Sequence, residues 1–237
     1  NALNEDFYLR ISLELPLKKM LVGSFENVFE IGRIFRNEGI DREHLQDYTQ
    51  MECYSAYRDY EWMMQFIEKL YKKIIQALFG KLQTTYNGTA IDWSAPWEKC
   101  DYYALFKKHA GIDLSSANDK LLAERAKELK LEVPKNAGRG KFIDGIYKKL
   151  VRPHLLQPCF LIDPPVDVEP LAKRLPRDPN RVERFQIMAG GTELGKGFSE
   201  LNDPRDQRKR FEEQMKLRAA GDKEAQQLDE SFLEALE

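Results

Sequence analysis

Cysteine is scarce in this chain of 237 residues, which holds only Cys53, Cys100 and Cys159. The three lie far apart in the sequence and form no C-x-x-C pair, which argues against a disulfide framework and a structural zinc site and fits a reducing compartment. No run of residues is apolar enough to cross a membrane, and the start, NALNEDFYLR, lacks the basic-then-apolar order of a signal peptide. These absences predict a cytoplasmic protein without membrane contact.

An excess of charge of either sign is also absent, because 37 basic residues nearly balance 39 acidic ones. A balanced chain is not a general nucleic-acid binder by electrostatics, so any nucleic-acid contact has to be local. Hydrophobic residues make up 42% of the chain and charged residues 32%, which is the composition of a folded protein with one large domain or two small ones.

Several common catalytic motifs are missing as well. The sequence contains no G-x-S-x-G, no P-loop, no dinucleotide fingerprint and no H-E-x-x-H. His109 and His154 have no carboxylate or cysteine at ligand spacing, so we interpret them as structural residues.

Periodicity and turn residues predict hairpins separated by helices. Helices are expected within 13–25, 58–79, 202–221 and 232–237, strands within 26–38, 47–57 and 158–163, and hairpins that turn at Asn87-Gly88 and Gly190-Gly191. Without a regular βαβ alternation, this order predicts an α+β fold with an antiparallel sheet flanked by helices. Residues from about 95 to 158 are expected to form a mainly helical insertion, to which we assign no role.

The first predicted hairpin carries polar residues where a strand that only builds a core would not need them. The two-residue period of a strand gives each of its strands a shared face. These faces carry Gly32, Ile34, Arg36 and Glu38 on the first strand, and Tyr48, Gln50, Glu52 and Tyr54 on the second. If the two faces coincide, one surface joins an arginine, two carboxylates and two tyrosines.

Such a surface suits a nucleotide site built on strands. The guanidinium of Arg36 holds a phosphate or carboxylate in bidentate fashion. Glu38 would accept a hydrogen bond from an exocyclic amine, Tyr48 would stack on a ring, and His44 would contact a phosphate. The alternative is a surface ion pair of Arg36 with Glu38 or Glu52, which is common and contributes little. From these residues alone, the ion pair is slightly favoured.

The second predicted hairpin adds further charged residues. Lys196, Phe198 and Glu200 share one face of its second strand. Glu193 is out of phase with them unless one of the strand's glycines hosts a β-bulge. Glu52 and Glu200 are expected to converge on one cation, because two carboxylates buried together need one. That cation is either a ligand or the chain's own Lys196.

The stretch FRNEGIDREHLQDYTQMECYSAY, residues 35–57, closely resembles motif 2 of the class II aminoacyl-tRNA synthetases, in its lysyl form. Residues 183–214 resemble the later strand pair and following helix of that family, and residues 1–23 resemble its segment before motif 2. The likeness covers both ends of the chain well and the middle loosely. It implies that residues 1–237 are part of a class II synthetase-like catalytic domain.

The resemblance implies a reaction, its substrates and a set of roles. A homodimer would use ATP and magnesium to convert L-lysine to lysyl-adenylate and would transfer the lysyl group to tRNA(Lys). Arg36 would bridge the substrate carboxylate and the α-phosphate, where it stabilises transition-state charge. The implied ATP contacts are Arg36, Glu38, His44, Tyr48 and Glu193, with Glu193 also the magnesium ligand. The implied lysine contacts are Glu14, Arg36, Glu52, Tyr54, Phe198 and Glu200.

Three residues depart from the family pattern. Gln186 stands where relatives commonly have a second metal-binding glutamate, which puts the stoichiometry or affinity of magnesium in question. Lys196 replaces a usual asparagine, and its charge would repel a lysine ligand or pair with Glu193. Leu45 replaces a usual asparagine in the motif 2 loop.

The resemblance also implies that motifs 1 and 3 and the anticodon-binding barrel lie outside residues 1–237. We therefore expect this stretch alone to be inactive. Two other functions stay open: a paralogue that lysylates a protein or makes another amino-acid adenylate, and a synthetase-like binding or regulatory protein without turnover.

Overall fold

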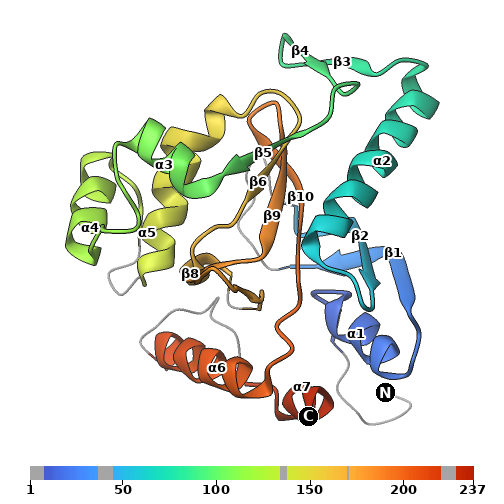
Figure 1. Ribbon diagram of the computed structural model, residues 1–237, viewed down its shortest axis with the longest axis vertical. Coiled ribbons are helices and arrows are strands. Elements are labelled where there is room, and N and C mark those ends of the chain that lie inside the picture. The colour runs from blue at the N-terminus through green and yellow to red at the C-terminus, as the bar shows by residue number, and fades with distance from the viewer. Residues whose placement is uncertain (1–7, 37–44, 134–137, 170, 220–227) are drawn as a thin grey trace. The chain divides into compact units, whose positions relative to one another are not determined.

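The computed structural model describes residues 8–36, 45–133, 138–169, 171–219 and 228–237. The chain divides into two compact units, Asn1–Arg58 and Asp59–Glu237, and each is described on its own. Figure 1 shows the order of the elements along the chain.

The first unit consists of helix α1 (Glu14–Val22) and the antiparallel hairpin of β1 (Asn27–Phe35) and β2 (Asp47–Ser55). Ile34 lies opposite Tyr48, and the pairing continues residue by residue from there, so the two predicted polar faces coincide. Val28 and Ile34 are buried under α1, on the same face as these polar residues. The apolar part of this face therefore anchors the hairpin and leaves the other positions for polar side chains.

The second unit is built on a four-stranded sheet. Its strands, in spatial order, are β10 (Thr192–Phe198), β9 (Arg184–Ala189), β6 (Cys159–Ile162) and β5 (Glu98–Asp101). The prediction of an α+β fold is confirmed, and β10, β9 and β6 pair antiparallel. The predicted antiparallel sheet has one parallel pair at its edge, where β5 pairs with β6.

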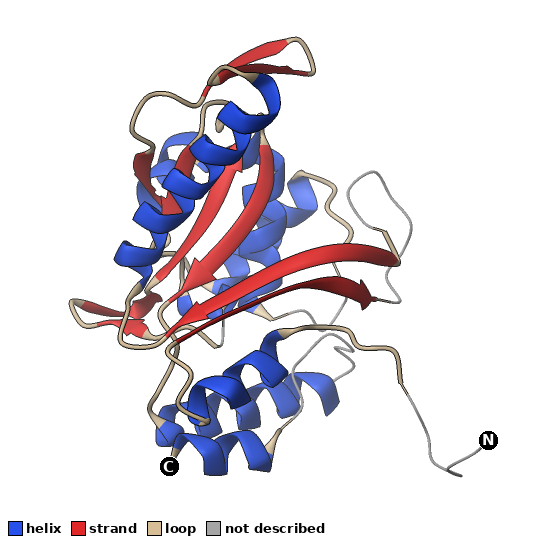
Figure 2. Ribbon diagram, turned by 90° about the vertical axis from the view of Figure 1, so that its right-hand side faces the viewer, coloured by secondary structure: helices blue, strands red, loops and turns tan. Residues whose placement is uncertain are grey.

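Helices cover both faces of this sheet (Figure 2). The helix α2 (Tyr60–Phe79) and the hairpin of β3 (Gln83–Tyr86) and β4 (Thr89–Asp92) share a core with one face of β6 and β9. The helices α3 (Tyr102–Ala110), α4 (Asp119–Glu128) and α5 (Arg139–Ile146) share a core with the other face. Alternation along β6 explains the division, since Phe160 contacts the first core and Leu161 the second.

The segment from about 95 to 158 is mostly helical, as predicted, but it begins with β5, which the sequence did not indicate. The four residues of β5, EKCD, carry no strand pattern. The helices that follow pack on Leu161 and Met188 of the central sheet. That this segment is an insertion remains a prediction.

The remaining elements include one hairpin that the sequence analysis missed. Its strands, β7 (Arg174–Leu175) and β8 (Asp178–Val182), pair antiparallel. The first of them lies at the end of a proline-rich connector, residues 164–176. These elements are η1 (Tyr147–Val151), η2 (Arg152–His154), η3 (Val166–Val168), β7 (Arg174–Leu175), β8 (Asp178–Val182), α6 (Pro204–Ala219) and α7 (Glu230–Leu236).

The predicted helix ends and turns are confirmed where the sequence signals were strong. The Asp59 carboxylate accepts the Trp62 amide at the start of α2, and Gly80 ends the helix in the left-handed region. Both central residues of the β9–β10 turn, Gly190 and Gly191, have positive φ angles, as a tight hairpin of this kind requires.

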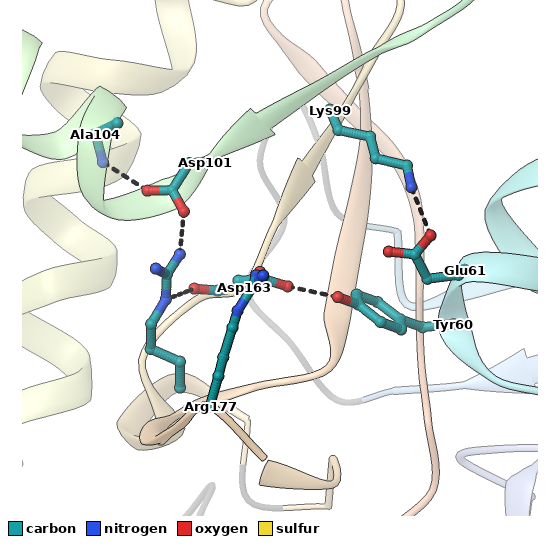
Figure 3. A network of polar contacts seen from close by, with 8 residues as sticks. Tyr60, Glu61, Lys99, Asp101, Ala104, Asp163 and Arg177 are labelled. Atoms are coloured by element: carbon teal, nitrogen blue, oxygen red, sulfur yellow. Dashed lines mark hydrogen bonds and ion pairs between the residues drawn. The ribbon is translucent and has the colours of Figure 1, made fainter. Parts of the chain in front are cut away.

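A buried carboxylate, Asp163, ties the second unit together at the end of β6 (Figure 3). Tyr60, the first residue of α2, donates its hydroxyl to Asp163 at 3.0 Å, and Arg177 donates to the other oxygen at 2.6 Å. Arg181 donates to the Asp163 carbonyl at 2.8 Å and also pairs with Asp101. Burial, followed by the nearby Asp163 charge, raises the pKa of Tyr60 and keeps it a donor.

Cys53, Cys100 and Cys159 are all free thiols. In the described part of the chain, no helix combines the length and the apolar character that crossing a bilayer requires.

Candidate active site

Arg36 follows β1 directly and is held on the polar face of the first hairpin. Its amide donates to the Gln46 carbonyl at 2.8 Å, which extends the ladder by one step beyond the strand. Its guanidinium nitrogen Nε contacts the Ile11 carbonyl at 3.2 Å, and the guanidinium lies 6.0 Å from the centre of the Tyr48 ring. The side chain is half-buried. This position leaves a planar cation above a flat aromatic ring, which suits an anionic group joined to a base.

Glu52 lies farther along the same face and has two side-chain donors. Tyr54 donates its hydroxyl to one carboxylate oxygen at 3.0 Å, and Gln50 donates to the other. Burial raises the pKa of Glu52 above its ordinary value of 4.5, and the Glu14 charge also raises it, while the Tyr54 hydrogen bond lowers it. The neighbouring side chains thus hold the carboxylate at a position where a bound cation would stabilise its negative charge.

Glu14 lies at the start of α1, near enough to Glu52 for the two charges to interact. Its carboxylate pairs with Lys18 one turn later at 2.6 Å, and the Lys18 ammonium lies 5.9 Å from the centre of the Tyr54 ring. The first unit therefore gathers five of the predicted site residues, namely Glu14, Arg36, Tyr48, Glu52 and Tyr54. The alternative prediction, a surface ion pair of Arg36 with Glu38 or Glu52, stays a prediction: Glu38 lies outside the described residues, and the Arg36 charge is among the influences that lower the pKa of Glu52.

The second hairpin contains the β-bulge that the phase of Glu193 required. The pairing register shifts between Glu193 and Gly195, which leaves Leu194 as the extra residue. Glu193 consequently lies opposite Met188, and Lys196 opposite Gln186, so that Glu193 and Lys196 share one face of the sheet. Gln186 donates to the Glu193 carboxylate at 2.5 Å.

Lys196 forms an ion pair with Glu169 and not with Glu193. The distance from its ammonium to Glu169 Oε2 is 2.9 Å, and Arg184 Nε lies 3.2 Å from the same oxygen. Pairing with Glu193, one of the two alternatives predicted for the Lys196 charge, is therefore wrong, because Lys196 pairs with Glu169 and Gln186 donates to the Glu193 carboxylate.

The other predicted site residues of the second unit are Phe198 and Glu200. Phe198 lies opposite Arg184 at the end of β10, on the same face as Lys196. Glu200 forms an isolated bridge with Ala172 just beyond the strand. Convergence of Glu52 and Glu200 on one cation remains a prediction, since they belong to different units. Glu38 and His44 lie outside the described residues.

The donor set around Glu193 fits a magnesium ion that takes most of its ligands from elsewhere. Magnesium in phosphate-transfer sites is commonly held by one or two carboxylates, with phosphates and water as the other ligands. Glu193 offers one carboxylate, and the Gln186 side chain beside it offers an amide oxygen. Among the described residues, no group of three or more histidine, cysteine or acidic side chains forms a protein-only cage for a metal.

His109 and His154 pack against each other rather than serving a ligand. Their rings stack 4.1 Å apart at an angle of 17°. Exclusion from water, and secondarily the neighbouring His154 and Lys108, lower the pKa of His109 and favour its neutral form. This arrangement agrees with a structural interpretation.

Four residues that contact predicted site residues or their neighbours were not anticipated from the sequence. Lys18 had a local signal, because a glutamate four residues before a lysine on a helix predicts a pair. Gln50 was placed on the correct face but was given no role. Glu169 and Arg184 had no signal, because the first lies in the connector before β7 and only the folded chain brings it to β9.

Two comparisons with known proteins find matches along the whole chain. The family described as tRNA synthetases class II (D, K and N) matches residues 1–237. The lysine--tRNA ligase of Chloroflexus aurantiacus is 45% identical over the whole chain, which covers 48% of that relative. The lysine--tRNA ligase of Moorella thermoacetica is 46% identical over the whole chain and 49% of its own length. The enzyme of that name from Porphyromonas gingivalis is 43% identical over the whole chain, which covers 41% of it.

The chain thus spans about half the length of the curated relatives that it matches. The family match extends over every residue of the chain and includes both hairpins that carry predicted site residues. The chain belongs to the class II tRNA synthetase family of the aspartate, lysine and asparagine type.

Proposed function

We propose that the protein containing this chain is a lysine–tRNA ligase, which activates L-lysine with ATP and transfers the lysyl group to tRNA(Lys). The observation that carries this proposal is the acidic cluster of the first unit, where Glu14 and Glu52 lie close enough to interact on the face that also carries Arg36. Carboxylates suit a cationic side chain and disfavour aspartate, and an uncharged asparagine would supply no counter-ion for the half-buried Glu52. The names of the relatives support the same substrate.

In the first step, the lysine carboxylate attacks the α-phosphorus of ATP and pyrophosphate leaves. Negative charge accumulates on the phosphate oxygens in the transition state, and a fixed guanidinium at Arg36 would stabilise it. The carbonyl of Ile11 and the backbone ladder at Gln46 hold Arg36 before substrate arrives, so little reorganisation is needed. Tyr48 would stack on the adenine ring, and the resemblance assigns Glu38 and His44 to the amine and the outer phosphates.

Recognition of the substrate side chain would fall to Glu52 and Tyr54, with Glu200 as a third contact. The two side-chain donors on Glu52 fix the carboxylate in one orientation, which lowers the entropic cost of gripping an ammonium. Phe198 would line the methylene groups, and Glu14 would receive the α-amino group.

Glu193, with the amide oxygen of Gln186, would hold magnesium against the phosphates. When bound, the ion neutralises phosphate charge as pyrophosphate leaves. Because Gln186 is uncharged, the protein contributes one negative charge to the ion at this position, and affinity for magnesium should depend strongly on the ATP that arrives with it. The homodimer and the cytoplasmic location implied by the resemblance remain predictions.

The proposed function is tested by amino-acid-dependent ATP–pyrophosphate exchange with the full-length protein. We expect exchange with lysine and none above background with aspartate, asparagine or arginine, followed by charging of tRNA(Lys). Exchange with aspartate or asparagine in place of lysine would refute the proposal. Transfer of lysine to a protein and not to tRNA would favour the paralogue.

Replacing Glu52 by glutamine should raise the lysine KM by about 30-fold to 100-fold, because a charge-assisted contact to the ammonium becomes neutral. The KM for ATP should change less than about threefold, because the contact that is lost is made with lysine and not with ATP. Glu30→Gln is the matched control: Glu30 lies opposite Glu52 in the pairing but forms an ion pair with Arg10. Unchanged lysine kinetics in the Glu52 variant would remove its assigned role.

The pH dependence of lysine affinity provides a second test of the role of Glu52. Its pKa is raised above 4.5, chiefly by burial, and only the ionised form attracts an ammonium. Lysine affinity should therefore be complete at neutral pH and should decline as the pH falls through the raised pKa, earlier than an ordinary glutamate would allow. The Glu52→Gln variant should lose this titration, which lysine KM values measured across pH would show.

A further inference from the structure

Lys196 lies on the face of β10 that also carries Phe198, a predicted lysine contact. A positive charge there would oppose the binding of a lysine substrate. Lys196 lies two residues before Phe198, which corresponds to about 7 Å along a strand. The side chain of Lys196 is 47% exposed, so its charge is open to the face that it shares with Phe198. An unneutralised ammonium there would repel the ammonium of the substrate that the proposed function requires.

The described structure provides one carboxylate for this lysine, and it is a deeply buried one. The Glu169 side chain is 7% exposed and accepts the Lys196 ammonium at 2.9 Å through Oε2. Arg184, with a side chain that is 9% exposed, lies 3.2 Å from the same oxygen. A buried carboxylate between two cations is held in place by both and draws each of them towards itself.

Glu169 is the carboxylate that both Lys196 and Arg184 contact among the described residues. Without the Glu169 charge, the ammonium of Lys196, which shares a face with Phe198, would lose this ion pair. The same Glu169 oxygen lies close to both cations, so Glu169 is not a partner of Arg184 alone.

We propose that Glu169 is a positioning residue for lysine recognition, which neutralises Lys196 and holds its ammonium away from the substrate side chain. This inference rests on the proposed function, because it presumes a cationic substrate next to Phe198. It assigns a role to a residue of the connector that neither the sequence motifs nor the family resemblance pointed to.

The test is a double-mutant cycle in the full-length protein, with ATP–pyrophosphate exchange as the assay. Glu169→Gln should raise the lysine KM roughly tenfold, the effect of one unit charge about 7 Å away at an effective dielectric constant of about 30. The ATP KM should stay within about twofold. Adding Lys196→Met to this variant should return the lysine KM to within about threefold of wild type, because the repelling charge is gone.

Glu61→Gln serves as a matched control, because Glu61 also pairs with a lysine, Lys99, but through an exposed contact on α2. It should leave the lysine KM unchanged. A purely structural Glu169, needed only by Arg184, would predict that Lys196→Met fails to restore lysine binding, and that outcome overturns the inference. Parallel increases in the lysine and ATP KM values would overturn it as well.

If Glu169→Gln yields no folded protein, Lys196→Met alone carries the test. Its lysine KM should stay at or below the wild-type value, and an increase would overturn the inference. A wild-type protein that activates no lysine refutes the proposed function itself. A wild type that activates lysine normally, without rescue in the double variant, refutes only the role of Glu169.

Discussion

Replacing Arg36 by alanine is expected to lower the rate of lysine-dependent ATP–pyrophosphate exchange by about 10²-fold to 10³-fold. That range is typical for removal of one fixed donor that stabilises transition-state charge. Arg36 is half-buried and is held by the Ile11 carbonyl above Tyr48, so no mobile side chain replaces it easily. Arg36→Lys should recover only part of the rate, because an ammonium cannot form the bidentate contact.

The control for this prediction is Arg33→Ala. Arg33 lies on the opposite face of β1 and forms a solvent-exposed pair with Asp47 at 3.4 Å, so its loss should change the rate by less than about twofold. The measurement is kcat and both KM values in the full-length protein, with the melting temperature recorded for each variant. If Arg33→Ala and Arg36→Ala lower the rate equally, the loss comes from removing any positive charge near this strand. That result would contradict a specific role for Arg36.

Replacing Asp163 by alanine is expected to destabilise the second unit by about 3 kcal/mol, the largest stability effect we predict. The change leaves the buried Tyr60 hydroxyl without its acceptor and removes the partner of Arg177. Part of the Arg177 contact is open to solvent, which limits its contribution. Alanine also tolerates the positive φ of 58° at this position poorly.

Asp163→Asn removes the negative charge of the side chain but keeps its size, so it measures the contribution of the charge to stability. Asparagine adopts positive φ readily and accepts the Tyr60 hydrogen bond, so we expect a loss of about 1–2 kcal/mol. Glu61→Gln, which breaks an exposed pair in the same region, should cost less than about 0.5 kcal/mol (Figure 3). Thermal unfolding measures all three, and Asp163→Ala should lower the melting temperature by roughly 6–10 °C. A shift as small as that of Glu61→Gln would show that Asp163 is dispensable.

The elements with strong local signals were predictable from the sequence. The helix that became α2 has apolar residues at helical spacing, an aspartate at its start and a glycine at its end, and it forms as expected. The hairpins at Asn87-Gly88 and Gly190-Gly191 are fixed by residues that tolerate positive φ. By contrast, β5 and the pair β7–β8 are short and lack periodicity, so distant pairing partners define them.

The same division holds for the site. A two-residue period correctly placed Arg36, Tyr48, Glu52 and Tyr54 on one face, because alternation is a local property of a strand. The bulge before Gly195 was foreseen as a condition, since a glycine permits it and the phase of Glu193 needed it. The partner of Lys196 was assigned wrongly, because strand alternation suggests only residues of the same hairpin.

The sequence by itself determined the family, the main helices and hairpins and the face on which each strand carries its polar groups, because these follow from repeats and motifs a few residues long. Only the tertiary structure decided which charges neutralise each other. Glu169 meets Lys196 and Arg184, and Asp163 meets Tyr60 and Arg177, across long stretches of chain. Buried charges require partners wherever the fold supplies them, and sequence distance does not constrain that choice.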